Sequence, residues 1–160
     1  MIDVESASLC PDNNELEIPM RKCRIDRINR THRAISMDFS FAQPVNRSSE
    51  IGLTIEKWTE GAWHAIRAIP RKTNFCNVLD SPVHMFKDMF VNLKKVAGLK
   101  HPERCDFPAG NYSVRYPVDI TGDVPFWSGR FRATVVVKRI KNYRKVFCAQ
   151  ALVNLVEVPE

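Results

Sequence analysis

The sequence lacks most of the patterns that mark membrane proteins and the large enzyme classes. No apolar run approaches the roughly 20 residues that a membrane-spanning helix needs. The sequence contains neither a glycine-rich phosphate loop nor a nucleophile-elbow motif. Its four histidines are scattered, without a carboxylate at a recurring spacing. We therefore expect a protein that is not an enzyme, with no catalytic residue and no cofactor.

The paired-ligand knuckle of zinc sites is missing as well. Cys76, His84, His101 and Cys105 could be drawn as a zinc site, but they lack such a pair, and we expect no metal. Five cysteines in 160 residues instead favour an oxidising compartment, with two disulfides and one thiol left over. A disulfide between Cys76 and Cys105 would close a loop of about 30 residues, worth roughly 3 kcal/mol.

Three N-x-S/T sequons also favour a secreted protein. They make Asn29, Asn46 and Asn111 candidate glycosylation sites. The chain opens with Met1-Ile2-Asp3-Val4-Glu5, without the basic and apolar regions of a signal peptide. If the protein is extracellular, we expect that its signal peptide has been removed and that Met1 is not native.

The net charge of +6 comes with two basic clusters, in residues 21–33 and 138–145. Such clusters fit a solvated strand edge, an anionic headgroup or protein partner, or a nucleic acid. A protein that binds nucleic acid on a sheet surface would have exposed aromatic rings between these charges, and such rings are sparse here. Ile25, Ile28 and Ile140 have the spacing of inward positions between solvated charges. We expect solvated strand edges, keep an anionic headgroup or partner as the alternative, and expect no nucleic-acid binding.

The composition favours a mostly β protein. Valine and isoleucine number 27 against 19 for alanine and leucine, and β-branched residues suit half-buried sheet surfaces. The chain length fits one domain over residues 1–160. Residues 1–20 show no periodicity and are predicted to form an extended arm.

Alternating apolar residues predict six or seven strands. Residues 50–69 are predicted to form a hairpin with a three- or four-residue loop, and Pro117 makes its strand an edge or a bulged one. A two-layer, immunoglobulin-like β-sandwich with one inserted helix fits this pattern. The predicted strands cover residues 33–41, 50–58, 63–69, 112–120, 131–137 and 146–156.

A helix is predicted near residues 82–97, where apolar residues recur at helical spacing. Ser81 fits its N-cap and Gly98 the position just after its end. Its apolar face, which includes Phe86, Met89 and Phe90, is either ordinary core or one wall of a lipid cavity. The loop carrying Phe126 and Trp127 is likewise either a buried plug or an apolar lip that touches membranes.

Several stretches resemble the ML lipid-recognition superfamily, in particular its ganglioside-activator branch and the insect chemosensory protein B (CheB) group. The resemblance covers about residues 50–156 closely and residues 1–49 loosely. The stretches that carry it are Leu53-Thr54-Ile55-Glu56-Lys57, Gly61-Ala62-Trp63, Phe75-Cys76-Asn77-Val78-Leu79-Asp80, Cys105-Asp106-Phe107-Pro108-Ala109-Gly110-Asn111-Tyr112-Ser113, Val124-Pro125-Phe126-Trp127-Ser128-Gly129-Arg130-Phe131 and Phe147-Cys148.

The resemblance implies a cup-like β-sandwich whose sheets splay apart around an apolar cavity, without catalytic residues. It also implies two disulfides, Cys76 with Cys105 and an early cysteine with Cys148; spacing favours Cys10 over Cys23 as that early cysteine. We expect the ligand to contact twelve apolar side chains: Leu53, Ile55, Trp63, Phe86, Met89, Phe90, Tyr112, Val114, Phe126, Trp127, Phe131 and Val135.

The function expected from the resemblance is that of a secreted lipid-binding protein. Its ligand would be a lipid, a fatty acid or a hydrocarbon pheromone, carried in chemosensory tissue. The alternatives are an activator that extracts membrane lipid and presents it to a hydrolase, and an interaction sandwich without a ligand. The expected partners are therefore the hydrophobic ligand, a transiently contacted membrane surface, and a receptor or hydrolase.

Overall fold

The computed structural model describes residues 2–30, 32–66, 72–80, 84–118 and 129–155. These residues form nine strands, two short 3₁₀ helices and one α-helix. In chain order the elements are β1 (Ile2–Leu9), η1 (Asn13–Glu15), β2 (Lys22–Arg27), β3 (Arg33–Phe41), β4 (Ser49–Thr59), β5 (Ala62–Ala65), β6 (Lys72–Asn74), η2 (Phe75–Asp80), α1 (His84–Val96), β7 (Gly110–Pro117), β8 (Gly129–Arg139) and β9 (Lys145–Leu155).

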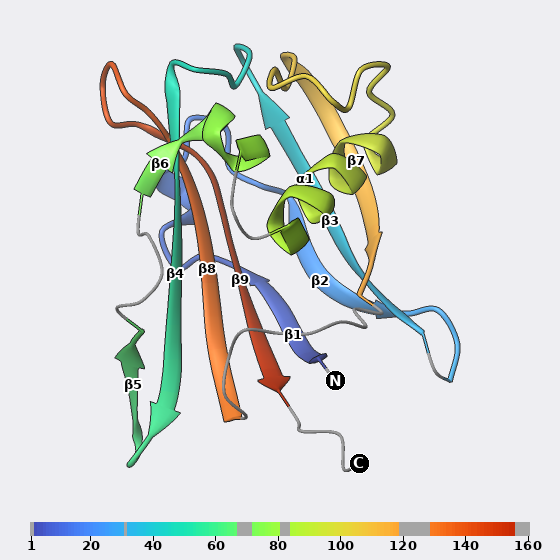
Figure 1. Cartoon of the computed structure of the whole chain (residues 1–160), viewed down its shortest axis with the longest axis vertical. Helices are drawn as coiled ribbons and strands as arrows, with labels where there is room; N and C mark the ends of the chain where they lie inside the picture. The colour runs from blue at the N-terminus through green and yellow to red at the C-terminus, as the bar shows by residue number, and fades with distance from the viewer. Residues whose placement is uncertain (1, 31, 67–71, 81–83, 119–128, 156–160) are drawn as a thin grey trace.

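The strands form two antiparallel sheets, which confirms the predicted mostly β, two-sheet architecture. The large sheet has the order β1-β9-β8-β4-β5, with β6 also paired to β4. The small sheet has the order β2-β3-β7, so β7 is an edge strand, as Pro117 predicted. Figure 1 shows the two sheets side by side, and α1 contacts β7 of the small sheet and η2.

An aromatic cluster fills the space between the sheets. Phe39 of β3 meets Phe147 of β9 edge to face, with ring centroids 5.3 Å apart. Phe41, Phe107 and Tyr112 complete the cluster. The predicted apolar face of β3 therefore packs on the large sheet.

The expectation of an extended arm over residues 1–20 was wrong, because β1 pairs with β9 along its whole length. A register shift between Val4 and Ser6 moves the inward position by one residue. The apolar residues of β1 therefore change phase at this bulge, from Val4 to Ala7 and Leu9. No single alternation of apolar and polar residues runs through the strand, so the sequence pattern does not predict it.

The β4–β5 hairpin is tighter than expected. Its loop has two residues rather than three or four, Glu60 and Gly61, with φ angles of 53° and 80°. Positive φ at both positions is the mark of a type I′ turn, whose twist suits a two-residue hairpin. The predicted continuation of the second strand through residues 67–69 lies outside the described residues.

The helix α1 is confirmed over His84–Val96, and its end follows the predicted glycine signal. Gly98 has a φ of +83°, Leu99 N–H bonds the Lys94 carbonyl, and Gly98 N–H bonds the Lys95 carbonyl. These two bonds form a Schellman motif, which satisfies the last carbonyls of the helix. The predicted start at Ser81 lies outside the described residues. No helix among the described residues has the length and apolar content to span a bilayer.

The basic clusters are less uniform than the sequence suggests. Ile28 and Ile140 are exposed rather than inward, because they lie beyond the end of β2 and in the β8–β9 turn. Lys22 pairs with Asp38, and Lys145 bonds Asp12. Some of the basic side chains therefore pair with nearby carboxylates, and the two clusters do not form one open cationic face.

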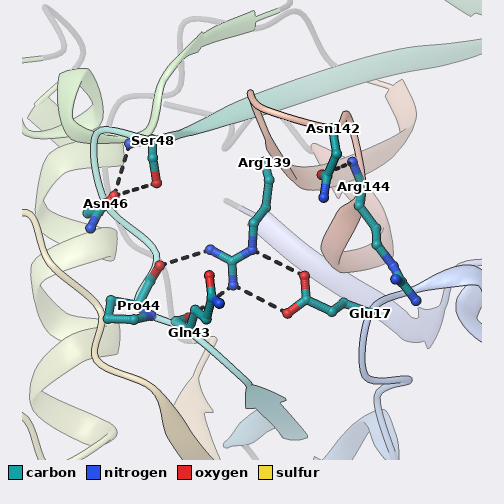
Figure 2. Close-up of polar contacts among 8 residues, drawn as sticks. All are labelled: Glu17, Gln43, Pro44, Asn46, Ser48, Arg139, Asn142 and Arg144. Atoms are coloured by element: carbon teal, nitrogen blue, oxygen red, sulfur yellow. Dashed lines mark hydrogen bonds and ion pairs between the residues drawn. The ribbon is translucent and has the colours of Figure 1, made fainter.

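Arg139 is the most deeply buried charge of the second basic cluster, with 8% of its surface exposed. Its guanidinium donates to the Glu17 carboxylate at 3.2 and 3.5 Å and to the carbonyls of Pro44 and Gln43 at 2.9 and 3.0 Å, as Figure 2 shows. A buried charge is tolerated when it is paired and hydrogen-bonded. Arg139 thus joins the end of β8 to the segment after η1 and to the loop after β3.

We expect Arg139→Met to lower the free energy of unfolding by about 3 kcal/mol, because it leaves the Glu17 carboxylate and two carbonyls without their donor. Chemical unfolding followed by circular dichroism measures this. Lys141→Met, which removes an exposed charge from the adjacent turn, is the matched control. Equal stability of the two variants would show that the Arg139 network does not hold the sheets.

Lys94 anchors the last turn of α1 from inside the protein. Its side chain is fully buried, its ammonium donates to the Arg104 carbonyl, and it lies 4.9 Å from the Phe90 ring centroid. Burial lowers the pKa of Lys94 to about 8, although the charges of Asp106 and Glu103 oppose this shift. The helix is thereby tied to the segment that contains Cys105.

The lowered pKa of Lys94 predicts a stability that rises with pH. Between the folded value of about 8 and the ordinary value of about 10.5, the unfolded chain keeps a proton that the folded chain releases. The free energy of unfolding of the wild type should therefore increase from about pH 7 to about pH 10, relative to Lys94→Met. Urea unfolding at both pH values tests this, with the exposed neighbour Lys95→Met as control. If the difference in free energy of unfolding between the wild type and Lys94→Met is the same at both pH values, the pKa of Lys94 is not lowered by burial.

Candidate functional site

An apolar strip covers the inner face of the large sheet at the end that carries the β4–β5 hairpin. Ile55 and Phe131 are 8% and 3% exposed and form a cluster separate from the main core. Partly buried apolar side chains pack around them. We call this surface the apolar strip, and it consists of Leu53, Ile55, Ile66, Phe131, Ala133 and Val153.

Strand alternation places the apolar strip on the side that faces the small sheet. On β8, Phe131 and Ala133 share a face with Val137, which pairs with the core residue Phe147. On β4, Leu53 pairs with Val135, a neighbour of the same face. The strip thus continues the inner surface of the sandwich beyond its core.

The residues between those of the strip point to the opposite face and carry the charges. Arg132 donates two hydrogen bonds to the Glu56 carboxylate, at 2.9 and 3.0 Å. Arg130 pairs with Glu5 across the same face at 3.2 Å. The two faces of β4 and β8 therefore differ sharply in chemistry, apolar inside and charged outside.

The apolar strip is only partly covered. Leu53, Ala133 and Val153 are intermediate in exposure although they lie on the inner side of a sheet. Core residues of the same face near the other end of β8 and β9, such as Val137 and Phe147, are buried. Partly exposed apolar surface between two sheets is the kind of surface that an apolar ligand can cover.

Four of the twelve expected ligand contacts come together on this inner face of β4 and β8. Leu53 and Val135 are cross-strand partners, and Ile55 packs with Phe131. These four residues come from strands far apart in the sequence, so their proximity depends on the β4–β8 register.

Three other expected contacts lie within or against the main core. Val114 is buried on β7. Tyr112 donates from its hydroxyl to the Pro108 carbonyl at 2.6 Å, and burial raises its pKa. Phe90 packs edge to face on Phe75, with ring centroids 5.1 Å apart. The protein itself thus supplies neighbours to these side chains.

Trp63 does not join the inner group. It pairs with Trp58 across the β4–β5 hairpin on the outer face, with ring centroids 5.1 Å apart, and the Arg132 guanidinium lies 4.9 Å from its ring. The loop is one or two residues shorter than predicted, and such a shift changes the face on which a side chain lies, because face follows register. Phe126 and Trp127 lie outside the described residues, as do the side chains of Phe86 and Met89.

Sequence reasoning missed four residues of this region: Ile66, Ala133, Val153 and Lys57, which follows Ile55 on the inner face of β4. Val153 lies on β9, whose sequence is apolar on both faces, so alternation alone does not identify the inner one. Pairing with Phe131 in the β8–β9 register identifies it. The sequence could therefore have identified Ala133 and Val153 as inner residues if the register of the β8–β9 hairpin had been known.

Two open hollows lie on the outer faces of the sheets, and neither is lined by the apolar strip. One, of about 270 Å³, lies on the small sheet between Lys22, Asp26, Ser113 and Arg115. The Ser36 hydroxyl donates to Asp26 there and lowers the pKa of its carboxyl. The other, of about 360 Å³, lies on the large sheet and is lined by Ser6, Ser8, Trp58, Trp63, Arg130, Arg132, Gln150, Ala151 and Leu152.

The cysteines serve structure. Disulfides join Cys10 to Cys148 and Cys76 to Cys105, the pairs that the resemblance implies. Cys23 is free and buried, and burial raises its pKa to about 11, so its thiolate is scarce near neutral pH.

Neither group of potential metal ligands offers a metal centre. A zinc site that uses the sulfurs of Cys76 and Cys105 is excluded by their disulfide. Asp12 lies within 4.8 Å of both Cys10 and Cys148, but those sulfurs are also bonded to each other. The Asp12 carboxylate accepts a hydrogen bond from the Lys145 ammonium, and this bond lowers the pKa of Asp12.

The candidate glycosylation sites differ in exposure. Asn29 and Asn111 are exposed, whereas Asn46 is half-buried. The side-chain oxygen Oδ1 of Asn46 accepts from both the backbone N–H and the hydroxyl of Ser48, at 2.9 and 2.7 Å (Figure 2). Glycosylation at all three positions stays a prediction.

No protein-family model matches the sequence. No curated protein sequence matches it either. Among solved structures, the chain is similar to chicken MD-1, in the crystal structure of its complex with lipid IVa, with a TM-score of 0.41 and 10% sequence identity. The alignment covers 94% of this chain and 88% of that chain. Membership of the ML superfamily and the finer resemblance to its ganglioside-activator and CheB branches stay predictions from the sequence motifs.

Proposed function

We propose that the protein is a secreted, non-enzymatic carrier that holds a hydrophobic ligand between its two sheets, at the apolar strip. The observation that carries the proposal is the separation of this strip from the main core. Ile55 and Phe131 are buried, while Leu53 and Val153 beside them keep exposed surface on the inward side of the sheet. A ligand chain lying there would cover this remaining surface.

The driving force for binding would be removal of apolar surface from water. Each methylene buried contributes about 0.8 kcal/mol, so about ten methylenes give roughly 8 kcal/mol before the entropic cost of binding is subtracted. An apolar wall supplies this without polar specificity. A lipid, a fatty acid or a hydrocarbon would therefore be suitable ligands.

The disulfides support the extracellular part of the proposal. Cys10–Cys148 spans 138 positions and Cys76–Cys105 spans 29, and disulfides persist mainly in oxidising compartments. The resemblance in sequence motifs implies two uses for a secreted carrier, delivery of a signal lipid in chemosensory tissue and presentation of membrane lipid to a hydrolase. Both need reversible uptake of an apolar chain, which is the property proposed here.

A pair of neighbouring substitutions on β4 tests the proposal. Leu53→Asp places a carboxylate on the apolar strip, whereas Thr54→Asp places the same group on the exposed outer face of the strand. We expect Leu53→Asp to reduce the affinity for the neutral fluorescent probe N-phenylnaphthylamine at least about tenfold, because a ligand chain would desolvate the carboxylate. Thr54→Asp should bind as the wild type does.

Circular dichroism of both variants controls for folding. Wild-type protein that takes up no probe would show that the sandwich has a closed interior, as expected of an interaction domain without a ligand. Equal binding by the two folded variants would place the probe elsewhere on the protein. Either result would contradict a carrier that uses the apolar strip.

A further inference from the structure

The inner face of β4 carries a cation after its apolar residues, and only the exposed Thr59 follows it on that face. Ile51, Leu53 and Ile55 precede Lys57 on the same face of the strand, and Lys57 pairs in register with Phe131. Its ammonium nitrogen lies 5.8 Å from the centroid of the Phe131 ring. Lys57 is half-buried. The apolar strip therefore has one positively charged end.

The stem of Lys57 passes over the backbone at the start of β8. Gly129 has a φ of +146°, and a Cβ built there would lie 3.1 Å from Cε of Lys57. The absence of a side chain at Gly129 leaves space for the lysine stem beside Phe131. The ammonium is thus positioned by packing as well as by the strand.

Lys57 has no carboxylate partner among the described residues, unlike several cations near it. The neighbouring Glu56 is on the opposite face and is engaged by Arg132. Arg130 is likewise engaged by Glu5. A half-buried ammonium over an aromatic ring gains some cation–π stabilisation, but an anion would satisfy its hydrogen-bond donors far better.

We propose that Lys57 binds the anionic headgroup of a single-chain lipid whose hydrocarbon tail lies along the apolar strip. This inference rests on the proposed carrier function and gives the ligand a polarity and an orientation. The headgroup lies at the β4–β5 end, beside Phe131, and the tail runs toward Leu53 and Val135. Carboxylate and phosphate share the required chemistry, an oxyanion that accepts from an ammonium.

The test compares three ligands with the same tail and different headgroups: hexadecanoate, hexadecyl phosphate and hexadecanol. Each competes with bound N-phenylnaphthylamine on wild-type protein. We expect both anions to bind about tenfold more tightly than the alcohol, the effect of one charge-assisted contact. The ratio between the two anions distinguishes a fatty acid from a phosphorylated lipid as the preferred class.

Lys57→Met should abolish this preference, so that the variant binds both anions no more tightly than it binds hexadecanol. Lys141→Met removes the same charge near the opposite end of β8 and should keep the preference. Equal wild-type affinities for all three ligands would overturn the inference, as would a preference that persists in Lys57→Met. Wild-type protein that binds hexadecanol without preferring the anions overturns only this inference, whereas wild-type protein that binds neither the probe nor any ligand overturns the carrier function itself.

Discussion

The buried guanidinium of Arg139 fastens one end of the β-sandwich, and the rest of the arrangement depends on that fastening. Arg139 lies at the last residue of β8 and bonds the Glu17 carboxylate and the carbonyls that follow β3. The Cys10–Cys148 disulfide holds the end of β1 to β9 close by in the fold. Among the described residues no strand pairing joins the two sheets, so these cross-links add direction to a sheet-to-sheet packing that is otherwise non-directional. The main core, with Val137 and Phe147, is built at this end.

At the opposite end of β8 the link between the sheets is more exposed, an ion pair between Arg33 of β3 and Asp3 of β1. There the inner surface consists of the separate cluster around Ile55 and Phe131, bordered by side chains that keep exposed area. The outer face of the same strands is tightly paired through Arg132 and Glu56, so the sheet itself is well supported. Rigid strands with an apolar, partly uncovered inner face are what a carrier requires, because the wall stays in place while its ligand changes. Lys57 follows Ile55 on this face and adds a charge that would orient the ligand.

The sequence predicted the elements whose periodicity is uninterrupted. The alternation of β3, the helical spacing before Gly98 and the edge position of Pro117 each follow from local chemistry. β1 was missed because the bulge between Val4 and Ser6 changes the phase of its apolar residues. Trp63 was expected inside because face depends on register, and register follows from a two-residue turn that the spacing alone does not specify. The site depends more strongly on long-range pairing, since Leu53 and Val135 meet only through the β4–β8 register.

Native mass spectrometry of protein purified from its own tissue or from expressing cells tests the central claim most directly. If the protein is a carrier, a fraction of the molecules should hold a small hydrophobic adduct, which organic extraction removes while both disulfides remain intact. The extracted protein should then regain an adduct of the expected mass when hexadecanoate is supplied. A single mass equal to that of the polypeptide with any covalent modification but no ligand, before and after incubation with hexadecanoate, would contradict a carrier function and favour a sandwich with a closed core.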